Sequence, residues 1–350
     1  MSSSSTSFGA SAFPSPQQLG KLNRADALAY LSRIGVPSDV IDSRPSLALL
    51  RQLQSRHMLT VPFESTTVHV KDWGALDAPI ELGGGELVPL AEPGFRRVVD
   101  LRRGGYCFLL NGNFACLLRY FGFRVSECLA KVNMVRKDPD EFGVEWEALS
   151  HQVSIVDWSG SETRYLSDVG FGGGPAHPMA MIDGTEVRSI PSDDVFRLTR
   201  HESLPYASRS DLPDQAPTWV VSRRQSKSTA DGDTTEIDVP QYAFALLSTS
   251  FRDVKALNWY QSTNAEAVFN RLFLASILDE KGERTTLSYH EGSVDEAGEK
   301  AARLTTTRLR SRGGDDEVLT TRFVKMTVGA VRDVLEREFG MSFPQDYRGN

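Results

Sequence analysis

The spacing of apolar residues changes near residue 131, and this change constrains the fold more than any other feature of the sequence. In the first third, apolar residues recur at i, i+3, i+4 and i+7, as within 27–34, which is the spacing of an amphipathic helix. From 131 to 245 the spacing approaches two, and turn residues separate β-branched and aromatic segments. The remainder mixes both patterns. We therefore predict an α+β fold with helices first, a β-sheet or barrel next, and a mixed final part.

The length fits this division, since 350 residues at ~100–200 per domain predict two or three domains. We expect a helical domain at 21–130, a β domain at 131–245 and a mixed domain at 246–350. In the mixed domain, 272–277 and 284–289 are predicted strands. A terminal helix is predicted from the spacing of Val328, Val331, Leu335 and Phe339.

Charge and composition exclude several classes of partner. A net charge of −7 without a Lys/Arg cluster argues against nucleic-acid binding. No apolar run approaches the ~20 residues that span a bilayer. Residues 1–20 are rich in Ser and Pro and lack an apolar signal-peptide core, so we expect a disordered tail. The protein is therefore expected to be cytoplasmic, with no membrane partner.

The chain contains three cysteines, Cys107, Cys116 and Cys128. An odd number without a secretory signal does not indicate a disulfide framework, and the CxxC spacing of a zinc site is absent. A helix is predicted to begin close to Cys107, because an apolar face follows it and Gly122 stands at the position of a C-terminal cap. Cys116 falls on the opposite side of that helix and is predicted to be a buried core thiol.

Cys107 is the candidate nucleophile. At a helix start, unpaired amides and the helix dipole both favour a thiolate, and the preceding Gly104 and Gly105 permit close approach of the backbone. Nucleophilic catalysis by cysteine also needs an imidazole base and a group that orients it. The alternative, a small buried hydrophobic residue, stays open on this evidence alone.

His151 and Asp168 are candidates for the base and its orienting group. They flank Ser159-Gly160, a plausible two-residue hairpin turn, and a hairpin centred there places residues 151 and 168 directly opposite each other. Cross-strand neighbours lie ~4.5–5.5 Å apart at Cβ, close enough for a carboxylate to accept a hydrogen bond from an imidazole. An ordinary surface His–Asp pair is the alternative reading.

The sequence resembles the arylamine N-acetyltransferases, and its polar insertion at 222–238 is similar to that of the fungal members. The resemblance rests on these segments, which occur in the order of the family: Val61-Pro62-Phe63-Glu64, Arg103-Gly104-Gly105-Tyr106-Cys107 with Asn111 and Phe114, His151-Gln152-Val153, Asp168-Val169-Gly170-Phe171-Gly172, and Asn258-Trp259-Tyr260-Gln261-Ser262-Thr263. It covers the chain from about residue 23 to residue 343.

The resemblance implies a helical domain, a β-barrel and an α/β lid, with Cys107, His151 and Asp168 as a papain-like catalytic triad. It further implies acetyl-CoA or another acyl-CoA as co-substrate, an aromatic amine or hydrazine as acceptor, and no metal. By position, Phe171 lines the acyl and amine pocket. The resemblance places Gly170, Gly172 and Gly173 near CoA and pairs Glu64 with Arg103 in a buried ion pair.

One position departs from the family, which commonly has Glu where this chain has Leu109. Either activity is reduced or an apolar contact replaces the polar one. Two other functions also stay open: a cysteine hydrolase with the same triad, and a catalytically silent homologue that binds CoA or a partner protein. The preferred acyl group is equally open among acetyl, propionyl and malonyl, of which malonyl requires a cation near the pocket.

Overall fold

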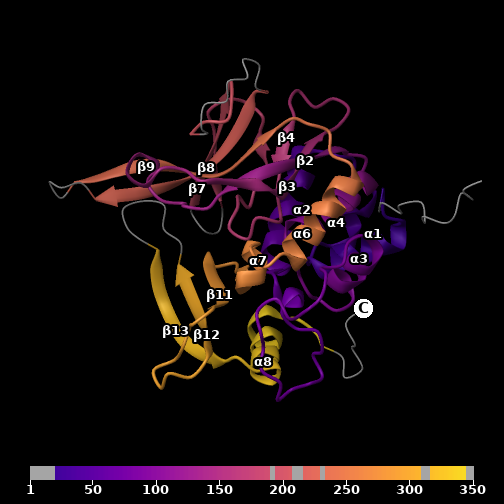
Figure 1. Cartoon of the computed structure of the whole chain (residues 1–350). Helices are drawn as coiled ribbons and strands as arrows, with labels where there is room; N and C mark the ends of the chain where they lie inside the picture. The colour runs from indigo at the N-terminus through magenta and orange to yellow at the C-terminus, as the bar shows by residue number, and fades with distance from the viewer. Residues whose placement is uncertain (1–19, 190–193, 207–215, 229–232, 309–315, 344–350) are drawn as a thin grey trace, which may run out of the picture.

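A computed structural model of the chain describes residues 20–189, 194–206, 216–228, 233–308 and 316–343. Figure 1 shows three parts: helices on one side, a curved sheet above, and a second sheet with a helix below. The tail expected at 1–20 lies outside the described residues, except for residue 20.

The helices occur mainly before residue 121 and after residue 250. Their bounds are α1 Arg24–Arg33, α2 Leu47–Thr60, α3 Ala91–Val99, α4 Cys107–Tyr120, α5 Pro139–Phe142, α6 Phe251–Thr263, α7 Val268–Arg271 and α8 Val328–Phe339, with 3-10 turns η1 Ser38–Asp42 and η2 Thr66–Val68. The strands are β1 Phe63–Glu64, β2 Arg124–Asn133, β3 Trp146–Asp157, β4 Tyr165–Ser167, β5 Met179–Ala180, β6 Thr185–Ser189, β7 Asp194–His201, β8 Thr218–Ser228, β9 Thr234–Ala245, β10 Leu272–Leu278, β11 Glu283–His290, β12 Ala301–Arg308 and β13 Glu317–Lys325.

Local capping residues determine where the first helices begin and end. The Asn23 side chain accepts a hydrogen bond from the Asp26 amide at 2.9 Å at the start of α1. Gly35 ends that helix with a φ of +65°, which glycine adopts without steric cost. At the start of α2, Ser46 accepts from the Leu49 amide at 3.2 Å. The predicted helical first part is confirmed.

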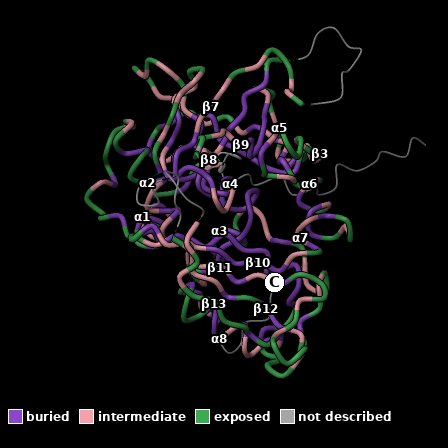
Figure 2. Tube along the Cα trace, turned by 90° about the vertical axis from the view of Figure 1, so that its left-hand side faces the viewer, coloured by how far each residue is buried: buried purple, intermediate pink, exposed green. Residues whose placement is uncertain are grey.

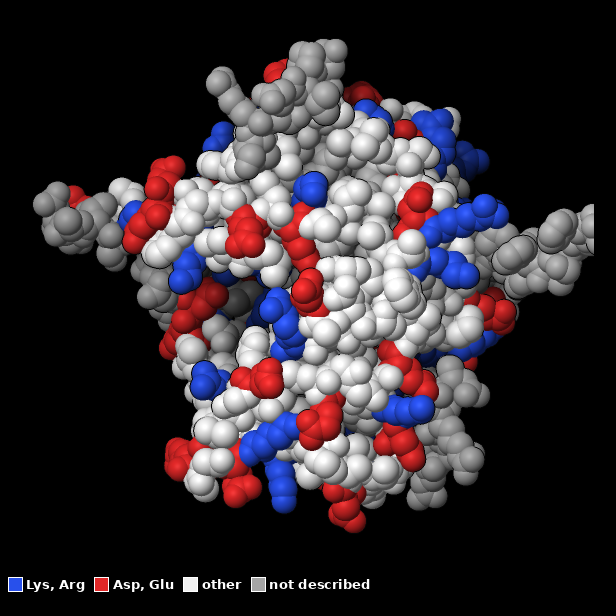
Figure 3. Space-filling view, viewed as in Figure 1, with Lys and Arg blue, Asp and Glu red and all other residues white. Residues whose placement is uncertain are grey.

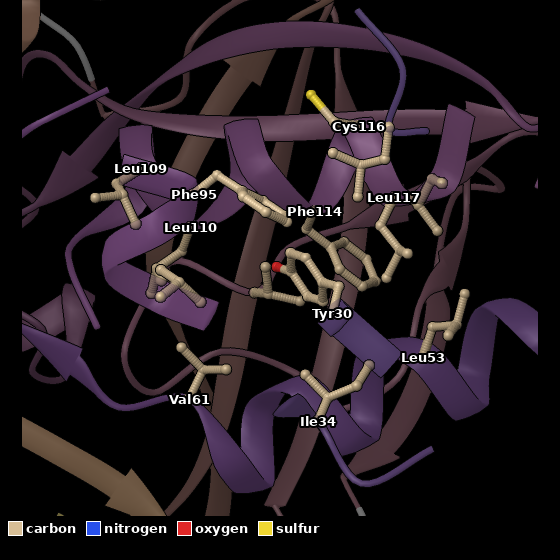
Figure 4. Packing of buried hydrophobic residues seen from close by; sticks show 14 of the residues in the cluster. Tyr30, Ile34, Leu53, Val61, Phe95, Leu109, Leu110, Phe114, Cys116 and Leu117 are labelled. Carbon is tan, nitrogen blue, oxygen red and sulfur yellow. The ribbon is translucent and has the colours of Figure 1, made fainter. Parts of the chain in front are cut away.

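The helices pack around one apolar core. Figure 4 shows Phe114 of α4 beside Tyr30 of α1, and Leu110 of α4 and Ile34, which directly follows α1, belong to the same cluster; each of these side chains is at most 1% exposed. Cys116 is also buried, and its sulfur points away from Tyr30, as its position on the helix predicts. This packing fixes α4, whose first residue is Cys107.

The middle part is an eight-stranded sheet with the order β5-β4-β3-β2-β9-β8-β7-β6, which curls into a nearly closed barrel. Its interior contains a separate apolar cluster that includes Phe196, Val221 and Phe244. The predicted β middle part is confirmed, but β2 begins at Arg124 and therefore crosses the expected boundary at residue 131. Most of the polar insertion at 222–238 lies in the paired strands β8 and β9.

The last part is a five-stranded sheet with the order β1-β10-β11-β12-β13, and α8 packs against it. Its strands β10 and β11 confirm the two predicted strands, and α8 confirms the terminal helix. The edge strand β1 comes from the helical part, because Phe63 pairs with Ser276 and Glu64 with Ala275. Val70, Trp73 and Ile80 also belong to this core. The division at 130 and 245 stays a prediction, since the first segment contributes to two bodies.

Buried residues lie in the middle of each part, and exposed residues lie in the loops and outer strands (Figure 2). On the face shown in Figure 3, acidic and basic side chains are interspersed, and a hollow opens between the barrel and the lower sheet. Among the described residues, no helix combines the length and apolarity that crossing a membrane requires. The cytoplasmic location stays a prediction.

Candidate active site

Cys107 is the first residue of α4, as predicted, and is 3% exposed. Its Sγ lies 3.6 Å from the carbonyl oxygen of Ser150. The preceding Tyr106 is extended and anchors the helix start, since its hydroxyl bonds to Asn258 Oδ1 at 2.7 Å and to Ser262 Oγ at 2.6 Å. The helix start is therefore anchored to α6 through Tyr106, and the thiol contacts β3 through the Ser150 carbonyl.

His151 lies on β3, and Asp168 directly follows β4. The distance from His151 Nε2 to Asp168 Oδ2 is 2.8 Å, and both side chains are at most 3% exposed. Because Nε2 is occupied by Asp168, Nδ1 is the ring nitrogen left for Cys107, which lines the same cleft. The structure thus brings together the three residues that the sequence nominated.

The predicted strand register is wrong by two residues. Ser154 pairs with Ser167, whereas a hairpin centred on Ser159-Gly160 pairs residue 154 with residue 165. The turn itself is present, since the Ser161 amide bonds to the Trp158 carbonyl, but 161–164 lengthen the loop on one side only. A shift of two keeps every side chain on the same face of the sheet, whereas a shift of one inverts the faces. His151 and Asp168 therefore still meet, as diagonal neighbours.

Asn111, one turn along α4 from Cys107, connects the parts of the site. Its Nδ2 donates to Asp168 Oδ1 at 2.9 Å and to the Gln152 carbonyl at 2.5 Å. Its Oδ1 accepts from the Val169 amide at 2.8 Å. The Gly170 amide also donates to Asp168 Oδ1 at 2.8 Å. Asp168 is therefore fully buried with a donor at each oxygen, which fixes its orientation.

These contacts determine the charge state of the pair. Burial by itself disfavours the imidazolium, but Asp168 and Cys107 outweigh it and raise the pKa of His151 to about 10. Burial likewise opposes ionisation of Asp168, yet His151, Asn111 and Gly170 hold the pKa of that carboxyl below its usual range. His151 is therefore protonated at neutral pH, and Asp168 is ionised.

Cys107 and His151 line a cleft of about 280 Å³ between the barrel and the lid. The ring centroid of Phe171 lies 5.2 Å from that of His151 in an edge-on arrangement. The other lining residues are mainly apolar or small, with three charged side chains: Phe63, Val132, Met134, Arg136, Glu147, Ser150, Gly170, Gly172, Gly173, Gln261, Val268, Phe269, Leu272, Leu274, Ser276, Arg284 and Thr286. Such a cleft suits a flat apolar ligand with few polar groups.

The glycines that follow Asp168 differ in their steric requirements. A Cβ at Gly170 would lie 2.6 Å from Cys107 Cα, so only glycine fits there. Gly172 has a φ of +78°, and a Cβ there would lie 2.9 Å from the Phe63 ring. A Cβ at Gly173 meets nothing within 4 Å. The loop therefore packs tightly on Cys107 at Gly170 and on the Phe63 ring at Gly172, and it is unobstructed at Gly173.

Both the sequence and the fold match those of known proteins. A sequence model of a family described as N-acetyltransferase matches residues 46–346. The chain belongs to the arylamine N-acetyltransferase family. It is 32% identical to the arylamine N-acetyltransferase of Mycolicibacterium smegmatis over 50% of this chain and 57% of that relative. It is 27% identical to an N-malonyltransferase of Fusarium pseudograminearum over 64% and 62%. The chain thus spans about three fifths of these two relatives.

Other relatives of this family match over more of their length. Arylamine N-acetyltransferase 1 of Rattus norvegicus is 25% identical over 92% of this chain and 96% of its own. The solved arylamine N-acetyltransferase of Mycobacterium marinum superposes with a TM-score of 0.61 at 26% identity, covering 90% of this chain and 92% of that one. The same enzyme has been solved in complex with CoA, with a TM-score of 0.59 at 25% identity, covering 89% and 92%.

Leu109, the departure from the common family pattern, is 1% exposed. Its side chain would lie 3.2 Å from a Cβ at Gly94 of α3 and 3.1 Å from a Cβ at Gly105. An apolar contact between α4 and α3 therefore occupies this position, which is the second of the two outcomes expected. The two glycines leave room for the branched side chain beside Cys107.

Glu64 has a closer partner than the one expected from the family. Arg103 Nη2 lies 3.6 Å from Glu64 Oε1, whereas Arg97 Nη2 forms a direct short ion pair with the same oxygen. Thr66 donates to the other oxygen from its amide at 2.8 Å. Burial opposes the charge of Glu64, but Arg97 and Arg103 outweigh it and lower its pKa to about 2. The residue missed from the sequence is Arg97, and its only signal was a basic residue two positions after Phe95 in a short amphipathic helix.

Proposed function

We propose that this chain transfers a short acyl group from acyl-CoA to the nitrogen of an arylamine or arylhydrazine through a thioester on Cys107. The observation that carries the proposal is the buried Asp168–His151 pair beside the Cys107 thiol in an apolar cleft. Family membership supports the reaction class, since relatives carry the name arylamine N-acetyltransferase. The CoA complex of the Mycobacterium marinum relative supports acyl-CoA as co-substrate.

In the first half-reaction, the Cys107 thiolate attacks the thioester carbon of acyl-CoA. A bond forms between Sγ and that carbon, and the bond from the carbon to the CoA sulfur breaks. The proton on His151 passes to the departing sulfur, which leaves the imidazole neutral. Asp168 holds the ring in position and stabilises its charged form before the transfer. The products are free CoA and an acyl-enzyme.

In the second half-reaction, the amine nitrogen attacks the acyl carbon of the Cys107 thioester. His151, now neutral, accepts a proton from the nitrogen, and the bond from the carbon to Sγ breaks. The thiolate and the imidazolium are thereby restored. Because CoA leaves before the amine reacts, the kinetics are of the ping-pong type.

The cleft provides a site for each substrate. The rings of Phe63, Phe171 and Phe269 offer apolar faces to an aromatic amine. Gly170 packs on Cys107 and lines the cleft together with Gly172 and Gly173, which supports a role for this loop beside the CoA thioester. The acyl group stays open at this point, because relatives carry the names of both an N-acetyltransferase and an N-malonyltransferase.

Mass spectrometry of the intact protein mixed with acetyl-CoA and no amine tests the covalent step. We expect an added acetyl group that maps to Cys107 and disappears when an arylamine is added. The matched controls are Cys116→Ala and Cys128→Ala, which remove buried thiols whose pKa is raised by burial. An adduct absent with every acyl-CoA contradicts the proposal. Hydrolysis that an amine leaves unchanged supports a cysteine hydrolase instead.

A further inference from the structure

The cleft contains more positive charge than transfer of a neutral acetyl group requires. Besides Cys107 and His151, its ionisable lining residues are Arg136, Glu147 and Arg284. Among the residues that the structure describes, neither guanidinium forms an ion pair within 4.0 Å. Arg136 is exposed and has Glu147 in the same lining, but Arg284 is only half-exposed, and a partly desolvated cation without a direct counter-ion calls for an explanation.

The two arginines lie on different walls and differ in their surroundings. Arg136 follows β2 on the barrel side, is exposed, and stacks 4.9 Å from the centroid of the Phe171 ring. Glu147, from β3, faces the same region and acts to raise the pKa of Arg136 against desolvation. Arg284 is on β11 of the lid sheet, where the cleft lining includes no acidic side chain from the lid. Arg284 is thus the cation whose own wall of the cleft provides no acidic neighbour among the described lining residues.

The pairing of β10 and β11 places hydroxyl groups on the same face as Arg284. Side chains alternate along each strand, so Phe273, Ala275 and Leu287 point into the lid core. Ser276 and Thr286, directly paired across the two strands, therefore point into the cleft with Arg284. Their oxygens are 3.1 Å apart, so one O–H bonds the pair and the other is left for a ligand.

The Gly170–Gly172 loop connects Arg284 to the thiol. Gly170 packs on Cys107, and the Gly172 carbonyl accepts a hydrogen bond from Arg284 Nη1. Two residues of extended chain span at most ~7 Å, so the guanidinium and the thiol are held by opposite ends of one short loop. A neutral donor is enough to bond the Gly172 carbonyl. The charge and the remaining N–H groups of Arg284 therefore need another partner.

Electrostatics agree with this reading of the site. Burial lowers the pKa of Arg284, although the carboxylates of Asp194 and Asp316 act in the opposite direction. Both carboxylates are bonded to Arg223, at 2.7 Å and 3.0 Å. One guanidinium does not neutralise two carboxylates, so Asp194 and Asp316 also act on Arg284 at longer range, while its N–H groups on the cleft side stay available to a ligand.

We propose that Arg284, with the hydroxyl groups of Ser276 and Thr286, binds a carboxylate on the acyl group of the donor. This inference rests on the proposed function and names the acyl class, the short dicarboxylic acyl-CoAs. Malonyl-CoA is the smallest of them, with one methylene between the thioester carbonyl and the carboxylate. The reaction uses the same bond changes as acetyl transfer, and the carboxylate is carried unchanged to the amine.

The test compares malonyl-CoA, acetyl-CoA and propionyl-CoA by CoA release with 4-methoxyaniline, a neutral acceptor. Propionyl-CoA matches malonyl-CoA closely in chain length but has no charge. We expect kcat/KM to be highest for malonyl-CoA in the natural protein. In Arg284→Gln, we expect the ratio of malonyl-CoA to propionyl-CoA to fall by roughly ten- to a hundredfold, the range for a lost charge-assisted hydrogen bond. Arg284→Lys should restore part of the ratio.

Arg136→Gln is the matched control, because it removes the same charge from the opposite wall. We expect a smaller change of the ratio there. Thermal unfolding of each variant verifies that the fold is retained, and Ser276→Ala provides a milder test of the same subsite, with a lower ratio expected.

Each other outcome overturns the inference in a distinct way. If all three donors weaken equally in Arg284→Gln, the arginine binds the CoA moiety that they share. If the ratio changes only in Arg136→Gln, the assignment to Arg284 is wrong. If the natural protein prefers acetyl-CoA over malonyl-CoA, the acyl class is wrong while the proposed function stands. If no acyl-CoA acylates Cys107, the proposed function itself fails.

Discussion

The two walls of the cleft differ in how completely their charges are compensated. We call the wall formed by α4, β3 and the end of β4 the triad wall, and the face of β10 and β11 the lid wall. On the triad wall, Asp168 has donors at both oxygens and faces a charged imidazole. On the lid wall, Arg284 donates to the Gly172 carbonyl and, within the part of the chain that the structure describes, forms no ion pair within 4.0 Å. Compensated charges hold reacting atoms in one arrangement, whereas an uncompensated charge is available to a ligand.

The same contrast extends behind the triad wall. Glu64 is buried and forms ion pairs with two arginines, Arg97 and Arg103. The Arg103 guanidinium also lies 4.8 Å from the Trp73 ring centroid and 4.6 Å from that of Phe343. These contacts connect the segment before Cys107 to the lid core. The structural ion pair is thus separate from the proposed substrate cation, and variants can distinguish the two roles.

The largest expected effect is the loss of the nucleophile. Cys107→Ala should lower kcat by at least about 10⁴-fold, because no group remains to carry the acyl group. Stopped-flow measurement of CoA release tests this expectation. Cys128→Ala, a buried thiol of the barrel, is the control, and an equal loss there would mean that thiol removal harms the fold rather than the chemistry.

The next largest effect should follow from Asp168→Asn. We expect kcat to fall by about 10³- to 10⁴-fold, because the imidazole loses both its orientation and the charge that favours its protonated form. The pKa of His151, followed by NMR of the ring protons, should fall from its raised value at the same time. A large loss of activity with an unchanged His151 pKa would assign Asp168 a purely structural role.

Breaking the buried ion pair should affect stability rather than selectivity. Glu64→Gln should reduce the free energy of unfolding by about 3–5 kcal/mol, because two buried guanidiniums lose their counter-ion. Urea denaturation measures this loss in the free energy of unfolding. The control is Arg124→Gln, which breaks an exposed pair with Asp157 and should cost less than about 1 kcal/mol. If Glu64→Gln lowers the free energy of unfolding as little as Arg124→Gln does, the buried ion pair does not stabilise the fold as proposed.

The same pair predicts a dependence on pH. The pKa of Glu64 is lowered to about 2, so its stabilisation is fully present above the ordinary carboxyl pKa near 4.5 and is lost as the pH falls toward 2. The stability difference between the natural protein and Glu64→Gln should therefore shrink by up to about 1.4 kcal/mol per pH unit in that window. Urea titrations at several pH values test it, and a constant difference contradicts the charge assignment.

The smallest expected effect concerns the loop between the walls. Gly170→Ala should destabilise the protein by about 1–3 kcal/mol, because the new methyl group contacts the Cys107 backbone. Gly173→Ala, where a Cβ meets nothing within 4 Å, is the matched control for stability. Calorimetry distinguishes the two, and equal melting temperatures would show that the loop yields without cost.

The sequence alone determined the features that depend on neighbouring residues. Helix starts at Asn23 and Ser46, the helix that begins at Cys107, and the strands of the lid follow from capping and periodicity, which act over a few residues. His151 and Asp168 meet as expected although the predicted register was wrong, because the error was an even number of residues. The alternation of side chains along each strand predicted which face of the sheet His151 and Asp168 share. The pairing register of β3 and β4 depended instead on the asymmetric loop between them.

Only the tertiary structure decided which distant charges meet. The ion pair of Arg97 with Glu64, the pairing of Phe63 with Ser276, and the bond from Arg284 to Gly172 each join segments far apart in the chain. Nothing in local sequence encodes such contacts, since they depend on how whole elements pack and on which carboxylates other arginines already occupy. The sequence thus determined the candidate chemistry, and packing decided which cation faces the cleft without a direct ion pair.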